Sequence, residues 1–593
     1  MSQENNPKKF ETTTKVFEDV SSSAVASNEP SSYEEKKGNI KFKETWKNFA
    51  DSFKEAERDE EDYSNLTDIE KIARKTANTQ LQKSLGNIQL QMIAIGGSIG
   101  TGLFVGSGKA LANGGPAALL IAWLLIGSML FVTVHALGEL SVKFPVSGSF
   151  VTFNTKFISP AWGFAMAWNY ALQWLVAFPL ELVAASITID FWGAKVNHAV
   201  FIFVFWVLIV ALNLFGVEGF GYGEVIFSAI KIITVIGFVF LGVILDFGGS
   251  PNHQGYIGGK FWVEPGSFSN GFKGVCTVFL TAAFSFSGTE LCCLAACESA
   301  NPSKSLPKAT KQVFWRILLF YVISLTLVGL LVPYNDPRLF GSSKVDASAS
   351  PFVIAIENAG IKGLPSVMNA VIMISVLSVG NSAIYACSRT LTALSASYAP
   401  AFMHLDYVDR KGRPLVSIAI ASSFGLIAFI SADPVRGHEA FIWMSSLSGL
   451  SCILTWMSAC ISHIRFRRAL KVQNRSTDEL PFKSQGGVIG SYYGAILNFL
   501  VLVANFWVAM FPIGSKPDPK KFFQDYLSIP FVLAFYFAYM IYKKDFRVFI
   551  KAKDIDIDSG AREDVEALIE EVHQQEQELR QKSWYIRIYR TWC

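Results

Sequence analysis

The stretch from Gln91 to Phe104 reads QMIAIGGSIGTGLF, and it lies inside an apolar run long enough to cross a membrane. Four glycines fall within seven residues of it: Gly96, Gly97, Gly100 and Gly102. Each glycine costs a helix ~1 kcal/mol relative to alanine, so we expect the helix to be broken here. A broken helix survives in a bilayer where its freed backbone groups are buried in protein or line a cavity. The alternative is close packing of helices through small residues.

Apolar runs of membrane length recur from about Gln91 to about Tyr542 in a chain of 593 residues that is 51% hydrophobic and 17% charged. We therefore predict an all-α polytopic membrane protein with about 12 transmembrane helices. Residues 1–89 form a polar N-terminal tail that is expected to be mostly disordered, 90–542 carry the helices, and 543–593 form a C-terminal tail. Basic residues favour one set of loops, which predicts that both termini are cytoplasmic.

A second polar break follows in the predicted sixth span, where residues 282–290 read AAFSFSGTE. It resembles the first break, and paired breaks in two halves of a transporter indicate an inverted repeat with a binding site between the halves. N–H groups at one break would suit a carboxylate and C=O groups at the other would suit an ammonium. Such a clamp would suit a zwitterion. We expect Gly288 to be part of it.

Ionisable residues within spans are costly, by ~2.5–3.5 kcal/mol on insertion scales, so each must be paired, neutralised or functional. Lys231 is a candidate for proton exchange because burial favours the neutral amine. Glu181 follows Pro179 and is either a proton carrier or a hydrogen-bond anchor between helices. Glu290 either holds a proton or clamps the second break. Glu139 and Glu298 lie near predicted inner ends of spans, where we expect solvated roles.

The predicted eighth span contains a further polar stretch, Ser378-Val379-Gly380-Asn381. Ser378 would face the substrate between the two halves and influence selectivity. The alternative is a serine that only packs helices together.

Several motifs carry a family resemblance: GGSIGTGLF, FSFSGTE, CESANPSKSLPKA, VPYND, SPFVIAIEN and HIRFRRAL. With these the chain resembles the fungal amino-acid permeases of the amino acid–polyamine–organocation superfamily, most of all their general amino-acid permease branch. The resemblance covers roughly Ser84 to the C-terminus. It implies the 5+5 inverted-repeat (leucine-transporter-like) fold with two extra helices. It also implies proton-coupled import of a broad range of L-amino acids across the plasma membrane by alternating access.

The resemblance assigns roles to particular positions. The backbone around Ser98, Gly100, Thr101 and Gly102 would bind the substrate carboxylate, and Lys231 would occupy the place where sodium-coupled relatives bind sodium. The carbonyl groups that would bind the substrate ammonium are those near Phe284, Ser285 and Phe286.

The resemblance also concerns the tails. It implies ubiquitin-triggered endocytosis and endosomal or vacuolar trafficking through tail lysines such as Lys8, Lys9 and Lys15, and palmitoylation of Cys593. Aromatic residues and arginines precede Cys593 and would hold the tail at the lipid headgroups. The expected partners are amino-acid substrates, protons, the lipid bilayer and ubiquitin ligase machinery, with no nucleic acid.

Other classes of function are weaker interpretations. A permease of narrower specificity and an amino-acid receptor on the same scaffold both remain open. Discontinuous helices with a closed site disfavour an ion channel. The sequence shows no metal-ligand cluster, nucleophile–base set or phosphate loop, so we expect neither an enzyme nor a cofactor.

Overall fold

The structure is a computed structural model, and the part of the chain that it describes is helical, with no strand among these residues. The chain divides into two units, Met1–Phe53 and Lys54–Cys593, and all the helices below belong to the second. The described residues are 47, 51–56, 68–78, 80–253, 255–340, 350–398, 404–432, 434–562, 565–584 and 586.

Many of the helices are interrupted by short 3-10 or π-helical turns, which carry η labels. In chain order the elements are α2 (Asp68–Ala77), α3 (Asn87–Gly96), η1 (Gly102–Gly106), α4 (Ser107–Gly114), α5 (Pro116–Lys143), α6 (Phe150–Phe157), α7 (Pro160–Thr188), η2 (Ile189–Trp192), α8 (His198–Leu214), α9 (Gly216–Asp246), α10 (Lys260–Val263), α11 (Gly271–Phe286), α12 (Leu291–Leu294), η3 (Ala295–Glu298), α13 (Pro302–Lys311), α14 (Val313–Arg316), η4 (Ile317–Ile323), α15 (Ser324–Leu331), η5 (Pro337–Phe340), α16 (Pro351–Asn358), α17 (Leu364–Tyr398), α18 (Leu415–Phe424), η7 (Gly425–Ala432), α19 (Pro434–Val472), η8 (Thr477–Glu479), α20 (Gly487–Met510), α21 (Pro519–Tyr526), α22 (Ser528–Lys543) and α23 (Val565–Arg580).

Among the described residues, eight helices are long and apolar enough to cross a membrane, and the bent pair α21–α22 makes a ninth if it counts as one span. Two shorter apolar helices, α8 and the segment Leu415–Ser431, fall below that length. The first expected span is also below it, because the chain breaks between α3 and η1. The bent pair α21–α22, helix α8, the segment Leu415–Ser431 and the broken first span are thus four segments besides the eight long helices. Together they make up the about 12 spans expected from hydropathy.

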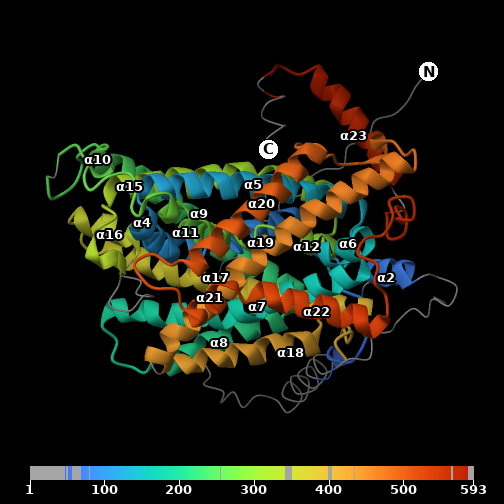
Figure 1. Cartoon of the computed structure of the whole chain (residues 1–593), viewed down its shortest axis with the longest axis horizontal. Coiled ribbons are helices and arrows are strands. Elements are labelled where there is room, and N and C mark those ends of the chain that lie inside the picture. The colour runs from blue at the N-terminus through green and yellow to red at the C-terminus, as the bar shows by residue number, and fades with distance from the viewer. Residues whose placement is uncertain are drawn as a thin grey trace, which may run out of the picture. The chain divides into compact units, whose positions relative to one another are not determined.

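The centre of the bundle is formed by α7 and α17, which pack against each other along much of their length (Figure 1). Helix α7 begins at Pro160, whose missing N–H costs nothing at a first helical position, and Ser159 caps it by accepting from the N–H of Trp162 at 3.3 Å. Pro179 lies inside α7, next to the section that faces the candidate site. Both helices bury nearly continuous runs of side chains.

The outer helices expose apolar side chains instead of polar ones. Phe203 on α8, Ile233 on α9 and Ile489 on α20 are 55%, 72% and 83% exposed. In water such surfaces would be unfavourable, whereas against lipid tails they are not. The distribution of side chains therefore agrees with a polytopic membrane protein.

The folded part extends beyond the limits expected from the sequence at both ends. Helix α2 lies within the segment 1–89 that we expected to be mostly disordered, and it buries Ile72 and Ala73 while packing against α6 and α17. After α22, residues 550–562, here called the C-terminal strap, bury Ile555 and Ile557. The strap N–H at Ile550 donates to the carbonyl of the residue after α6, at 2.9 Å. Short apolar patches hold both segments, and hydropathy windows of membrane length overlook them.

Candidate functional site

The first predicted break is present. Helix α3 ends at Gly96, and the helix resumes as the π-helix η1 and then α4. The intervening residues include Ser98, whose Oγ donates to the carbonyl of Ile95 at 3.0 Å. The N–H groups at the start of η1 precede their first intrahelical partners, as at the start of any helix. They lie at the positive end of the resumed helix, which favours an anion.

The second predicted break is also present. Helix α11 ends at Phe286, and α12 starts at Leu291. Gly288 lies between them with a φ of 95°, in the left-handed region that glycine adopts without strain.

The two breaks cross each other backbone to backbone. A Cβ atom at Gly288 would lie 2.4 Å from the carbonyl oxygen of Gly97, and one at Gly102 would lie 2.5 Å from Cα of Ser285. No side chain fits at either place. The two interpretations of the first glycine stretch are therefore both correct, because the segment is broken and its small residues also permit close packing against the second break.

A small cavity opens at this crossing. Its lining includes five residues expected at the site, namely Ser98, Gly100, Thr101, Gly102 and Phe284, together with Glu181 of α7. The remaining lining residues, to which the sequence analysis gave no role in binding, are Gly97, Trp174, Ala177, Ser287, Val379 and Ser448.

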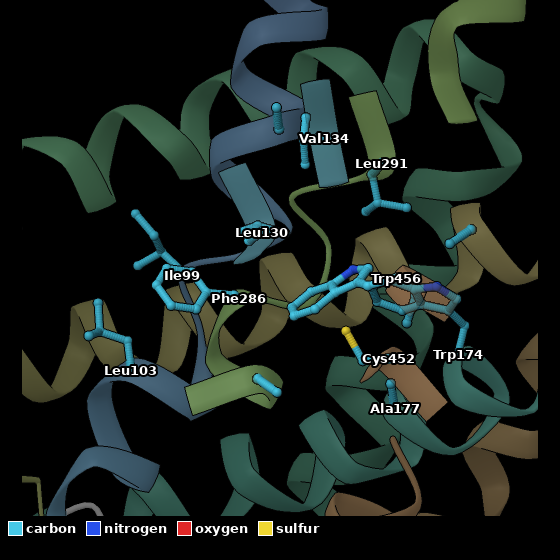
Figure 2. Packing of buried hydrophobic residues seen from close by; sticks show 14 of the residues in the cluster. Ile99, Leu103, Leu130, Val134, Trp174, Ala177, Phe286, Leu291, Cys452 and Trp456 are labelled. Carbon is cyan, nitrogen blue, oxygen red and sulfur yellow. The ribbon is translucent and has the colours of Figure 1, made fainter. Parts of the chain in front are cut away.

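Ser285, Phe286 and Gly288 are not among the lining residues. Figure 2 shows Phe286 in an apolar cluster with Ile99 of the first break. Phe286 also packs on the ring of Tyr321, with 4.2 Å between ring centroids. The ring of Phe286 therefore packs against residues at the crossing and does not line the cavity.

Tyr321 connects the two breaks, and the sequence analysis missed it. Its hydroxyl lies 2.9 Å from the carbonyl oxygen of Ser98 and 2.9 Å from that of Ser285. One hydroxyl proton serves one acceptor at a time, so the bond alternates between the two carbonyls. Its two partners lie far from it along the chain, so no local sequence pattern marked this residue.

Glu181 is buried in α7 and reaches the first break. It accepts a hydrogen bond from Oγ1 of Thr101, and both residues line the cavity. The structure thus brings the carboxylate of the predicted third span to the segment that would bind a substrate carboxylate.

Lys231 lies behind the first break instead of lining the cavity. Its Nζ donates to the carbonyl oxygen of Gly96 at 2.6 Å, and the side chain is fully buried in α9. A carboxylate on the same helix, Glu224, was missed. Helix α9 begins at Gly216, so Glu224 lies inside the helix, and it is fully buried.

Ser378 faces Glu224 and not the cavity. Its Oγ donates to the Glu224 carboxylate at 2.8 Å, whereas the next residue, Val379, lines the cavity. A Cβ at Gly100 would lie 2.4 Å from Cγ2 of Val379. The position that faces the site between the halves is thus one residue further along α17 than we expected.

Glu290 sits at the second break as the clamp interpretation requires. Its carboxylate accepts from the N–H of Gly288 at 3.2 Å, from the hydroxyl of Tyr170 at 3.3 Å and from Nε1 of Trp456 at 3.4 Å. These bonds connect the break to α7 and α19. Whether Glu290 also exchanges a proton stays a prediction.

Glu139 and Glu298 are buried, contrary to the solvated roles that we expected. Glu139 pairs with Arg467 at 2.7 Å and with His463 at 3.0 Å. Glu298 pairs with Arg389 of α17 at 2.9 Å. Hydropathy identified these ends of helices as near the membrane surface, but the folded loops cover them. The predicted modification sites Lys8, Lys9, Lys15 and Cys593 lie outside the described residues.

Comparison with known proteins identifies the family. Residues 89–552 match the family described as amino acid permease, which is most of the chain. The chain belongs to the amino acid permease family. It is 57% identical to the general amino-acid permease GAP2 of Candida albicans, over 94% of this chain and 95% of that protein. It is 54% identical to the general amino-acid permease GAP1 of Saccharomyces cerevisiae, over 92% of each.

Relatives in this permease family differ in the substrate that their names state. The histidine permease of Saccharomyces cerevisiae is 49% identical over 87% of this chain and 86% of that protein. The family and its relatives are transporters, so this permease is a transporter of amino acids and not an enzyme.

Proposed function

We propose that this permease is a proton-coupled symporter that imports a broad range of L-amino acids across the plasma membrane by alternating access. The observation that carries the proposal is the crossing of two broken helices at Gly97 and Gly288, beside a cavity lined by the first break. Broken helices that meet in this way present N–H groups of one and C=O groups of the other to one ligand. An inverted repeat of 5+5 helices would explain why the two breaks are paired.

The crossing suits the parts that all amino acids share. The N–H groups near Gly100, Thr101 and Gly102 would bind the carboxylate, and carbonyl groups near Phe284 and Ser285 would bind the ammonium. Because backbone groups make these contacts, they serve every substrate alike.

Side chains on the remaining wall would set the selectivity. Trp174, Ala177, Val379 and Ser448 line the cavity, and none of them carries a charge. An uncharged wall admits apolar and polar side chains without a fixed electrostatic preference. This supports broad specificity, as does the similarity to two general amino-acid permeases.

A narrower specificity is the second candidate, because the histidine permease is nearly as similar to this chain as the general permeases are. The identities to this chain are 49% for the histidine permease and 54% and 57% for the two general permeases, which are differences of five and eight percentage points. Differences of that size can lie wholly in the cavity wall or wholly outside it.

Glu181 and Lys231 support the coupling to protons. Glu181 lines the cavity and touches the first break through Thr101, while Lys231 holds the carbonyl of Gly96. A proton on Glu181 would therefore change the charge beside the substrate carboxylate. Glu290 could contribute at the second break.

Competition uptake separates the two specificities. Yeast cells that lack their own permeases and express this chain would take up labelled alanine, with each of the twenty amino acids added in excess. Broad specificity predicts inhibition by most of them, including acidic, basic and aromatic ones. Inhibition by a single chemical group of amino acids would favour the narrower permease, and no uptake of any amino acid would contradict the proposal.

The proposal includes cytoplasmic termini, regulation through ubiquitin ligase machinery at Lys8, Lys9 and Lys15, and palmitoylation of Cys593. Changing the three lysines to arginine should keep the permease at the cell surface after a preferred nitrogen source is added. A hydroxylamine-sensitive acyl label should disappear in Cys593→Ser. Normal internalisation, or a label that persists, would assign these roles to other residues.

A further inference from the structure

Glu224 carries a buried carboxyl group that the proposed substrate site does not use. It faces α17, where three groups donate to it: Ser378 Oγ at 2.8 Å, Asn381 Nδ2 at 2.9 Å and Ser382 Oγ at 3.2 Å. An ionised carboxylate only accepts hydrogen bonds, so three donors stabilise that form. The surroundings of Glu224 are thus arranged for an anion.

The amide of Asn381 is held in its donating orientation. Its Oδ1 accepts from Nδ2 of Asn213 on α8, at 2.9 Å. That Nδ2 also donates to the carbonyl oxygen of Ile209, at 3.0 Å, which fixes the amide of Asn213. Only the Nδ2 of Asn381 remains to face Glu224. Residues of α8 and α17 therefore fix the orientation of this donor.

Lys231 lies two helical turns after Glu224 on α9, and both residues meet the first break at Gly96. Lys231 donates to the carbonyl oxygen of Gly96, and a Cβ atom there would lie 2.1 Å from Oε2 of Glu224. Glu181 reaches the same break through its hydrogen bond from Thr101. One ammonium group and two buried carboxyl groups are therefore gathered at this break.

Glu224, Glu181 and Lys231 together carry a net charge of minus one when all three are ionised, since two of them are acidic and one is basic. A net buried charge is costly, and one added proton removes it. Glu224 accepts from three donors, whereas Glu181 accepts from Thr101. Glu181 also lines the cavity, where a proton can arrive. The added proton therefore belongs on Glu181.

Other titratable groups on the helices that pack against α9 are engaged elsewhere. They are His198 on α8, Tyr321 in η4, and Tyr385, Cys387, Arg389 and Tyr398 on α17. Their hydrogen bonds run to partners other than Glu224, so Lys231 and Glu181 are the charges that matter to it.

We propose that Glu224 is a permanently ionised counter-ion that positions Lys231 and leaves the transported proton to Glu181. This inference rests on the proposed proton-coupled transport. Through Ser378, Asn381 and Ser382 it also ties the charged group to α17, whose Val379 lines the cavity. Glu224 is thus a positioning residue for coupling and touches no substrate.

The test is the dependence of uptake on external pH. Without the anion in Glu224→Gln, Lys231 would attract Glu181 alone and favour its ionised form. The pH of half-maximal uptake should then move to more acidic values by about one unit, whereas Glu224→Asp should stay within about 0.3 unit of the wild type. Glu218→Gln, at an exposed position on the same helix, is the matched control and should not move it.

A purely structural role of Glu224 would lower the amount at the surface and leave the pH profile in place. A Glu224→Gln protein that reaches the surface with an unshifted or alkaline-shifted profile therefore overturns the inference. If wild-type uptake itself does not depend on pH, the proposed proton coupling fails instead, so the two failures are distinguishable.

A charge-neutral double variant covers the case in which Glu224→Gln does not reach the surface. Removing both charges in Glu224→Gln with Lys231→Met leaves no uncompensated Lys231 charge, so surface delivery should exceed that of Glu224→Gln alone. A double variant that is delivered no better than Glu224→Gln would show that the two charges do not depend on each other, and would overturn the inference.

Discussion

At the scale of single residues, the site depends on glycines that permit two backbones to touch. Gly288 and Gly97 are needed for different reasons. Gly288 has a positive φ and its missing side chain makes room for a carbonyl oxygen. Gly97 packs against the side chain of Leu291. A Cβ atom at Gly97 would lie 2.8 Å from Cδ1 of Leu291. Both contacts are independent of the substrate.

Gly288→Ala should therefore reduce the uptake of all amino acids alike. A strained backbone conformation costs of order 1–3 kcal/mol, so we expect a roughly tenfold or larger decrease in uptake per molecule at the surface. Gly237→Ala is the control, because nothing lies within 4 Å of a Cβ atom at Gly237. Loss confined to large substrates would mean that Gly288 only shapes the side-chain pocket.

Tyr321 should affect affinity because its hydroxyl holds the two breaks at a fixed separation. Tyr321→Phe removes a buried hydrogen bond worth ~1 kcal/mol, which corresponds to a roughly fivefold increase in KM. The increase should be similar for small and large amino acids. Saturation curves for labelled alanine and leucine measure it, and an unchanged KM for both would show that the hydroxyl does not support the site.

At the scale of elements, the C-terminal strap is joined to α6 and to the end of α19. Lys156 of α6 is buried, donates to the carbonyl oxygen of Ser559 and lies 3.8 Å from Oδ2 of Asp556. Gln473 Nε2 donates to the strap carbonyl of Ile555 at 2.8 Å. These contacts lie outside the membrane-spanning helices, so their charges can respond to pH.

Docking of the strap lowers the pKa values of Lys156 and Asp556. Burial lowers the pKa of Lys156 to about 8, although Asp556 acts in the opposite direction. For Asp556, burial opposes ionisation, but Lys156 and the N–H groups of Ser559 and Asp558 outweigh it and keep the pKa below its usual value. The ionised form of Asp556 thus stabilises the docked strap, and this stabilisation is lost only in acid, as the pH falls through the lowered pKa of Asp556.

Docking of the strap should strengthen between neutral and alkaline pH. Between pH 8 and the ordinary lysine pKa, the undocked Lys156 binds more protons than the docked one, so docking becomes more favourable as pH rises. From pH 7 to 9 we expect a roughly tenfold increase in the protection of strap amides from hydrogen exchange, corrected for intrinsic rates. Lys156→Met should abolish this increase and Lys553→Met, at an exposed position, should retain it. Equal protection at both pH values in the unmodified chain would contradict the account.

Elements with strong local signals were predictable from the sequence, and long-range partners were not. The two breaks follow from glycines at Gly100 and Gly288, because their effect on a helix is local. Tyr321 and Glu224 act through contacts with residues far along the chain, and no periodicity shows such contacts. Ser378 was placed one position from the wall because the rotation of α17 about its axis is set by packing against α7. Helix α2 and the strap were too short for the hydropathy windows.

At the scale of the whole molecule, coupling requires that the charges behind the first break communicate with the substrate in front of it. Lys231 reaches the break from α9, and Glu181 reaches it from α7. Both contacts fall within six residues, from Gly96 to Thr101. Movement of this segment would therefore change the charge group and the substrate site together.

Lys231→Met should abolish accumulation driven by a pH gradient while leaving delivery to the surface intact. The uncharged side chain has a similar length and no donor for the carbonyl of Gly96. Surface biotinylation and uptake at a series of external pH values measure the two properties separately. Accumulation against a gradient by a correctly delivered variant would remove Lys231 from the coupling mechanism.

The central claim is that a pH gradient drives amino acids through the crossing of the two breaks. The most direct measurement uses the purified full chain in liposomes, with labelled alanine outside and a pH gradient, acid outside, as the only energy source. The account predicts that internal alanine rises above the external concentration and falls back when a protonophore collapses the gradient. Alanine that enters only to equal concentrations, at the same rate with and without the gradient, would contradict it.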